Sequence, residues 1–248
     1  MKPLQNKRIL VTRSAEQSAP FVLLLKKYGA IPVLLPLIKI VPAQNTEEIH
    51  QKIAALHSFH QIIFTSSNAV KYFFHFCNQP LPTHIKIACV GKKTSDYLKG
   101  IGYSTHFIPE NYTAESLLDS ITVSANEKIL IPQSSLSDDL LYKGLTKKNC
   151  QVEKMVVYEN VPTAHDKESI EKIFSEKIDF ITFTSGSTAN NFIMLTKKYN
   201  IHYAESKVVC IGMETKIAAE ENGITVHAVA FPHTIEGILQ AIIKLNRV

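Results

Sequence analysis

Two clusters of small polar side chains are the first candidates for chemistry in this sequence. One runs from Thr65 to Asn68 (Thr-Ser-Ser-Asn) and the other from Thr184 to Thr188 (Thr-Ser-Gly-Ser-Thr), and each stands between an apolar run and a helical pattern. Hydroxyl groups and unpaired backbone N–H groups at the start of a helix bind carboxylates and phosphates well. Helix capping alone better explains any single one of these residues, but the pair of clusters favours ligand contact as well.

Thr94 and Thr215 hold a similar place in the sequence. They follow the pairs Val90-Gly91 and Ile211-Gly212, in which the glycine allows the backbone to approach a ligand closely. An ordinary turn glycine followed by a threonine in the first helical turn is an equally good interpretation. Together with the two clusters, these threonines predict a site for an anionic ligand.

The sequence gives no support for a nucleotide-binding site or a metal site. The sequence contains neither the Gly-x-Gly-x-x-Gly pattern of a dinucleotide site nor the Gly-x-x-x-x-Gly-Lys-Ser/Thr loop of a nucleoside triphosphate site. The ten histidines lack the spacing of metal ligands and the four cysteines show no Cys-x-x-Cys pair. We therefore expect no metal site.

Composition and charge narrow the class of protein. Of the 248 residues, 45% are hydrophobic and 20% charged, which is ordinary for a globular protein. No apolar stretch reaches the roughly 18 residues of a membrane helix, and no secretory signal is visible. With cysteines that fit no disulfide framework, this predicts a cytoplasmic protein. The net charge of +5 comes from scattered lysines, which suits an anionic small molecule better than nucleic acid.

The sequence contains an internal repeat with a period of about 120 residues. The run Ile9–Val11 recurs as Ile129–Ile131, and the hydroxyl clusters and the glycine-threonine segments recur in the same order. A period of this length excludes a solenoid unit and indicates two similar halves.

Short apolar and β-branched runs alternate with helical patterns in both halves. The runs expected as strands are Arg8 to Thr12, Gln61 to Thr65, Lys86 to Val90, Lys128 to Ile131, Asp179 to Thr184 and Lys207 to Ile211. This alternation is typical of parallel sheets covered by helices on both faces. We therefore expect an α/β protein with two similar doubly wound parallel-sheet domains. Its ligand should bind in a cleft between them, beyond the carboxyl ends of the strands.

Two proline-bounded extended segments, 36–42 and 154–162, interrupt the alternation at matching positions of the repeat. We interpret them as linkers between the domains, and two such extended linkers can pair as a short ladder.

The ordered set of motifs resembles the uroporphyrinogen-III synthase family over essentially the whole chain. The matching segments are Ile9–Arg13, Ile63–Val70, Val90–Thr94, Val157-Tyr158, Ile181–Thr188 and Ile211–Thr215. The resemblance implies one domain of residues 1–35 with 162–248 and a second of residues 42–153, while segments 36–41 and 154–161 form a two-stranded β-ladder linker. It also implies a monomer with a small-molecule substrate, transient contact with the preceding enzyme of its pathway, and neither nucleic acid nor membrane as a partner.

The resemblance further implies a lyase of tetrapyrrole (haem) biosynthesis that needs no metal or organic cofactor. Its substrate, hydroxymethylbilane, is a linear tetrapyrrole with eight carboxylates. The substrate loses its terminal hydroxyl as water, and the resulting azafulvene closes through a spiro intermediate that inverts the last pyrrole ring and gives uroporphyrinogen III. Because the free substrate closes to the uninverted isomer I, the protein's main task is to hold it in one pose.

Tyr158 is the candidate catalytic residue, because a phenol is protonated at neutral pH and can donate to the leaving hydroxyl. A tyrosine selected only for its β-propensity is the alternative. The residues expected to bind substrate are Arg13, Thr65, Ser66, Ser67, Asn68, Thr94, Ser185, Gly186, Ser187, Lys207 and Thr215. A surface ion pair explains Arg13 equally well, and an ordinary solvated lysine is the stronger interpretation of Lys207.

The segment around Gln133 departs from the arginine-containing pattern of many family members, and leaves that end of the expected cleft less basic. Two other functions fit part of the sequence. A two-domain protein that binds an anionic small molecule without catalysis accounts for the repeat and the linkers, but Tyr158 favours the enzyme. A flavodoxin-like flavin binder is weaker, since aromatic residues make up 8% of the chain and tryptophan is absent.

Overall fold

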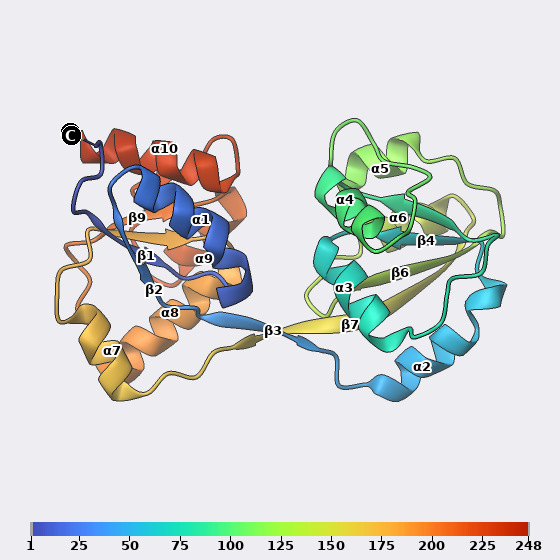
Figure 1. The fold of residues 1–248 in the computed structure, drawn as a ribbon, viewed down its shortest axis with the longest axis horizontal. Coiled ribbons are helices and arrows are strands. Elements are labelled where there is room, and N and C mark those ends of the chain that lie inside the picture. Colours follow the sequence, from blue (N-terminus) through green and yellow to red (C-terminus); the bar gives the residue numbers. More distant parts are fainter. Residues whose placement is uncertain (1, 248) are drawn as a thin grey trace. The chain divides into compact units, whose positions relative to one another are not determined.

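The chain forms two compact units in the computed structural model, which describes residues 2–247. Unit 1 combines Met1–Lys39 with Val161–Val248, and unit 2 consists of Ile40–Asn160. Each unit contains one five-stranded sheet with helices around it (Figure 1). The predicted class, α/β with two parallel-sheet halves, is confirmed.

The sheet of unit 1 is parallel throughout and has the strand order β10-β9-β8-β1-β2. Its strands are β1 (Arg8–Val11), β2 (Ile31–Leu34), β8 (Phe180–Phe183), β9 (Lys207–Cys210) and β10 (Ala228–Val229). Its helices are α1 (Ala15–Lys27), α7 (Lys167–Phe174), α8 (Gly186–Tyr199), α9 (Met213–Glu221) and α10 (Ile235–Asn246).

Alternate residues of these strands pack on opposite faces of the sheet, as the pleat requires. Leu10 and Ile181 belong to a buried cluster with residues of α7, α8 and α9, whereas Ile9 and Phe180 belong to a second cluster with residues of α1 and α10. Figure 1 accordingly shows α1 and α10 on one side of the sheet and α7 and α8 on the other. Both faces are therefore covered, which is why the central strands are mostly apolar.

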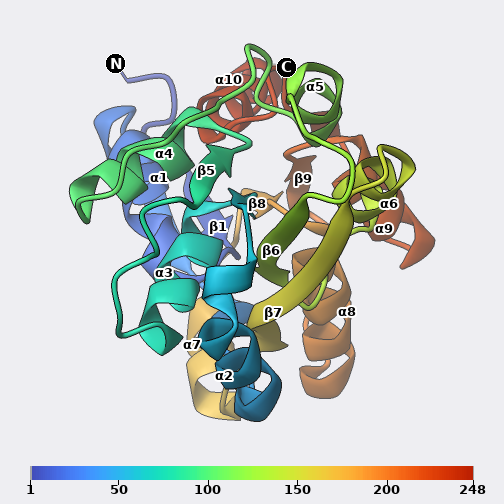
Figure 2. The ribbon, with the colours of Figure 1, turned by 90° about the vertical axis from the view of Figure 1, so that its right-hand side faces the viewer.

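The sheet of unit 2, whose strands are labelled in Figures 1 and 2, has the strand order β3-β7-β6-β4-β5. Its strands are β3 (Ile38–Pro42), β4 (Gln61–Phe64), β5 (Lys86–Cys89), β6 (Lys128–Ser134) and β7 (Gln151–Pro162). The α-helices of unit 2 are α2 (Thr46–Ala54), α3 (Ser67–Phe76), α4 (Lys92–Gly100), α5 (Ala114–Ser120) and α6 (Leu140–Lys147), and Leu56–Ser58 forms a single 3-10 turn. Strands β7, β6, β4 and β5 are parallel to one another.

The internal repeat is visible in the strand orders. In unit 1, β8 precedes a hydroxyl cluster and lies between β9, which ends in a cysteine, and β1, the first strand of the first sequence half. In unit 2, β4 precedes the other cluster and lies between β5, which also ends in a cysteine, and β6, the first strand of the second sequence half. Where unit 1 has β10 beside β9, unit 2 has a single parallel bridge between Phe107 and Ala88. The two units do not coincide with the two halves of the sequence repeat. β1 and β2 belong to the first half of the sequence but lie in one sheet with β8, β9 and β10 of the second half.

The two segments interpreted as linkers are both strands. β3 and β7 are hydrogen-bonded neighbours, and the backbone N–H of Ala43 donates to the carbonyl of Val157 at 3.1 Å. β7 also pairs with β6 along Gln151 to Tyr158. This part of β7 is therefore a strand of the sheet in unit 2 as well as part of the connection between the two units.

Two strands were not expected from the sequence, the two-residue β10 and β2. β2 contains Pro32 and lies at the edge of its sheet, where a residue without a backbone N–H is tolerated. Among residues 2–247, no helix combines the length and the apolar character needed to cross a membrane.

Candidate functional site

The first hydroxyl cluster lies at the carboxyl edge of the sheet in unit 2. β4 ends at Phe64, and Ser66 then caps α3, because its Oγ accepts a hydrogen bond from the N–H of Ala69 at 3.1 Å. Ser67 and Asn68 form the first turn of α3 and are half-buried. At a helix start the N–H groups of these two residues have no acceptor within the helix, so they are available to an anion.

β7 brings Tyr158 to this cluster. The phenol oxygen of Tyr158 lies 3.3 Å from Oγ of Ser66, and either hydroxyl can donate. The ring stacks on that of Tyr72 in α3, with 5.6 Å between ring centroids and 26° between the planes. Tyr158 is 8% exposed. The expected acid and one of the expected binding residues therefore share a hydrogen bond.

Thr94 stands at the same edge, because β5 is the parallel neighbour of β4 and α4 follows β5. Its N–H donates to the carbonyl of Gly91 at 3.1 Å, and the residue is 4% exposed. The backbone of Gly91 has φ −144°, and a Cβ added there would make only ordinary contact with Tyr112 at 3.6 Å. Neither torsion nor crowding demands this glycine, which favours the interpretation that a ligand approaches the backbone here.

The second cluster repeats the arrangement in unit 1. Oγ of Ser185 accepts from the N–H of Thr188 at 3.4 Å and lies 2.9 Å from Oγ of Ser187. Thr215 stands in the first turn of α9 after the neighbouring strand β9, and is 5% exposed. Gly186 has a packing role of its own, since a Cβ added there would lie 2.9 Å from Cβ of Ala218 in α9.

Arg13 also stands at this edge of unit 1, because it follows β1, the other neighbour of β8. Its Nη2 donates to Oε1 of Gln17 at 3.1 Å, and burial lowers the pKa of its guanidinium. Within the described chain, Nε of Arg13 and Oγ of Ser14 are buried without a hydrogen-bond partner. An incompletely paired, partly desolvated guanidinium favours an incoming carboxylate.

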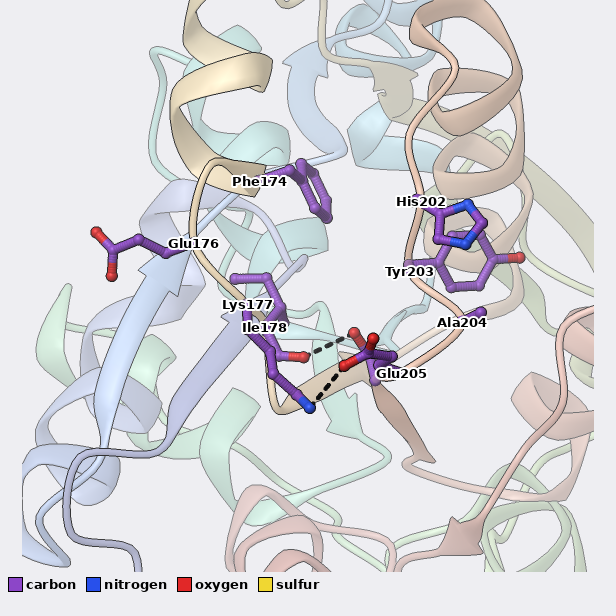
Figure 3. A pocket seen from close by; sticks show the side chains of 9 residues that line it. Phe174, Glu176, Lys177, Ile178, His202, Tyr203, Ala204 and Glu205 are labelled. Carbon is purple, nitrogen blue, oxygen red and sulfur yellow. Dashed lines mark hydrogen bonds and ion pairs between the residues drawn. The ribbon is translucent and has the colours of Figure 1, made fainter.

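Lys207 does not join these residues. It is the first residue of β9 and therefore lies at the opposite, amino edge of the sheet, where its Nζ donates to the carbonyl of Leu245 at 2.8 Å. The loops that precede β8 and β9 border a shallow hollow of about 180 Å³, shown in Figure 3 with the ion pair of Lys177 and Glu205 (2.8 Å). The structure favours a structural role for Lys207.

No three His, Cys, Asp or Glu side chains of the described residues gather as metal ligands would. All four cysteines are free and buried.

The sequence did not single out Tyr72. It lies on the apolar face of α3 with Ala69 and Phe73, all buried, and is indistinguishable from a core residue in the sequence. In the structure its hydroxyl donates to the carbonyl of Ile40 at 2.8 Å.

Comparison with known proteins agrees with the sequence motifs. The family profile described as Uroporphyrinogen-III synthase HemD matches residues 19–240. The chain is 32% identical to a putative uroporphyrinogen-III synthase of Methanocaldococcus jannaschii, over 96% of this chain and 99% of that protein. It is 30% identical to the porphyrin biosynthesis protein HemD of Ruminiclostridium josui over 99% of this chain, but it spans only 50% of the length of that relative.

Solved structures extend the comparison to the fold. The uroporphyrinogen-III synthetase of Helicobacter pylori superposes with a TM-score of 0.68 at 17% identity, covering 97% of this chain and 100% of that one. A mutant uroporphyrinogen III synthase of Thermus thermophilus gives 0.61 at 17% identity, covering 97% and 98%. The profile covers most of the chain, and the resemblance inferred from the motifs is thereby confirmed: this chain belongs to the uroporphyrinogen-III synthase family.

Proposed function

We propose that the chain dehydrates and cyclises hydroxymethylbilane, inverts the last pyrrole ring through a spiro intermediate and releases uroporphyrinogen III. As a member of its family, the chain is a cyclising lyase of tetrapyrrole biosynthesis. The observation that carries the proposal is the 3.3 Å contact between the hydroxyls of Tyr158 and Ser66, at the sheet edge of unit 2 that also carries the helix starts of α3 and α4.

In this proposal the carboxylates of the substrate bind at the carboxyl edges of the sheets. The donors are hydroxyl side chains, backbone N–H groups at helix starts and one guanidinium: Arg13, Thr65, Ser66, Ser67, Asn68, Thr94, Ser185, Gly186, Ser187 and Thr215. Many neutral donors and few cations suit a substrate whose charges are spread over a flexible chain, because several contacts together fix its pose. Lys207, at the other edge, has no part in it.

Tyr158 supplies the proton that turns the leaving hydroxyl into water. As the C–O bond of the terminal hydroxymethyl group breaks, the lone pair of the pyrrole nitrogen, which keeps its proton, forms the azafulvenium cation, and the phenol gives its proton to the departing oxygen. Ser66 orients the phenol and can donate a hydrogen bond to the phenolate that remains. The proton lost from the pyrrole when the macrocycle closes restores the phenol, so the net products are uroporphyrinogen III and water.

We also propose a cytoplasmic monomer whose domains are residues 1–35 with 162–248 and residues 42–153, connected by segments 36–41 and 154–161. The two compact units support these boundaries, with the difference that β7 pairs with β6 as far as Tyr158. Transient contact with the preceding enzyme fits the instability of the substrate, because a free substrate closes to isomer I.

A coupled assay tests the proposed function. The purified chain is given hydroxymethylbilane made in the same vessel, the product is oxidised to porphyrin, and isomers I and III are separated by chromatography. Isomer III is expected. Formation of isomer I alone, at the uncatalysed rate, would overturn the proposal and favour a protein that only binds an anionic tetrapyrrole.

A further inference from the structure

Two of the contacts of Tyr72 place it between the strand β3 and the phenol of Tyr158. Its hydroxyl donates to the carbonyl of Ile40 at 2.8 Å, and its ring stacks on Tyr158 with 5.6 Å between centroids and 26° between planes. The residue is 5% exposed, so its ring is fixed by its surroundings. Nζ of Lys71 lies 5.2 Å from the ring centroid of Tyr72.

The helix α3 therefore holds Tyr158 at two points. Ser66 caps the helix and meets the phenol oxygen at 3.3 Å, while Tyr72, within the same helix, meets the face of the ring. The hydrogen bond sets the direction of the hydroxyl, and the stack sets the plane of the ring. Both constraints are needed, because a phenol with one hydrogen bond can still turn about its ring axis.

The partner of the Tyr72 hydroxyl is also informative. Ile40 is the first residue of unit 2 and lies in β3, the strand through which the chain enters that unit. A tyrosine hydroxyl bound to this carbonyl ties the ring that packs against Tyr158 to the entering strand.

We propose that Tyr72 is a positioning residue for Tyr158: it fixes the plane of the phenol ring and links that plane to β3. The proposal rests on the proposed function of Tyr158 as general acid. Tyr72 does not touch the substrate in it, and acts only through the ring that it contacts. Its loss should therefore lower kcat and leave KM for hydroxymethylbilane nearly unchanged, because the residues that bind carboxylates stay in place.

The test uses Tyr72→Phe and Tyr72→Leu in the full chain. Tyr72→Leu removes the stack and should lower kcat by about tenfold with KM within about twofold. Tyr72→Phe keeps the stack and loses only the hydrogen bond to Ile40, so its loss should be smaller. It also remains informative if the leucine variant folds poorly. Tyr103→Leu is the matched control, because Tyr103 stacks on Phe74 of the same helix (4.7 Å, 26°), and it should keep the wild-type kcat.

A double variant separates positioning from general damage. Once Tyr158→Phe has removed the proton, adding Tyr72→Leu should cost no further turnover, since both changes act on one group. A different result would overturn the positioning role and leave the proposed function standing: Tyr158→Phe alone lowers turnover, and adding Tyr72→Leu lowers it again by the same factor as in the wild-type background. Equal losses in Tyr72→Leu and Tyr103→Leu would also overturn it. Wild-type turnover in Tyr158→Phe alone would remove both the acid and the residue that positions it.

Discussion

Replacing Tyr158 by phenylalanine separates chemistry from folding. The ring and its stack on Tyr72 remain, and what is lost is the hydrogen bond of 3.3 Å to Ser66. That distance is longer than the roughly 2.7–2.8 Å usual between two hydroxyl oxygens. We therefore expect the free energy of unfolding to fall by about 1 kcal/mol or less.

Turnover should fall further than stability. One acid–base group contributes about two orders of magnitude or more to a rate, but a hydroxyl leaves a pyrrolic carbinol easily even without help. We expect a loss of about ten- to a hundredfold in kcat, which corresponds to about 1.4–2.7 kcal/mol of activation free energy.

The measurement compares initial rates of isomer III formation at saturating hydroxymethylbilane with urea unfolding of the same preparations. Tyr203→Phe is a suitable control, since Tyr203 borders the hollow at the amino edge of unit 1 and its loss should leave turnover unchanged. Wild-type turnover in Tyr158→Phe would refute the reasoning, and so would an equal loss in the control.

Other substitutions and reagents test the placement and packing of residues away from the contact of Tyr158 and Ser66. Lys207→Met should keep KM within about twofold, because Nζ is bound to Leu245 at the amino edge; a tenfold rise in kinetic assays would place substrate there. Burial raises the pKa of Cys89 to about 11 and of Cys210 to about 12, so at pH 8 a disulfide reagent should label these thiols only after unfolding, and fast labelling of the native protein would contradict their burial. Gly237→Ala should lower unfolding free energy in urea by about 3 kcal/mol, since its Cβ would lie 1.9 Å from the carbonyl oxygen of Pro232. In Gly100→Ala the new Cβ would meet nothing within 4 Å among the described residues, so the free energy of unfolding should rise by up to about 1 kcal/mol. Equal effects of Gly237→Ala and Gly100→Ala would contradict the close packing at Gly237.

The strands that sequence patterns identified are the buried ones. β4 and β8 are buried along their whole length, and a strand covered on both faces reads as a nearly continuous apolar run. β2 was not predicted, because a proline within a short apolar run argues against a strand unless the strand lies at the edge of a sheet. The full extent of β7 was missed for another reason: which strand lies beside a segment depends on tertiary contacts that no local pattern records.

The candidate site divides in the same way. The clusters around Ser66 and Ser185 were predictable, since each is a local turn from strand to helix. The contact between Ser66 and Tyr158 joins residues 92 positions apart and needs the folded sheet. The placement of Lys207 could have been inferred, because a residue that opens a parallel strand lies at the edge away from the helix starts that follow.

The location of the bound tetrapyrrole is the most direct test of the central claim that chemistry takes place at the carboxyl edges of the sheets. Backbone amide resonances of the labelled protein are recorded while uroporphyrinogen III, the proposed product, is added. The largest shifts should fall on helix-start residues such as Ser67, Thr94 and Ser187, whose amides stand at these edges. Shifts confined to the hollow beside Lys177 and Glu205 would contradict the claim.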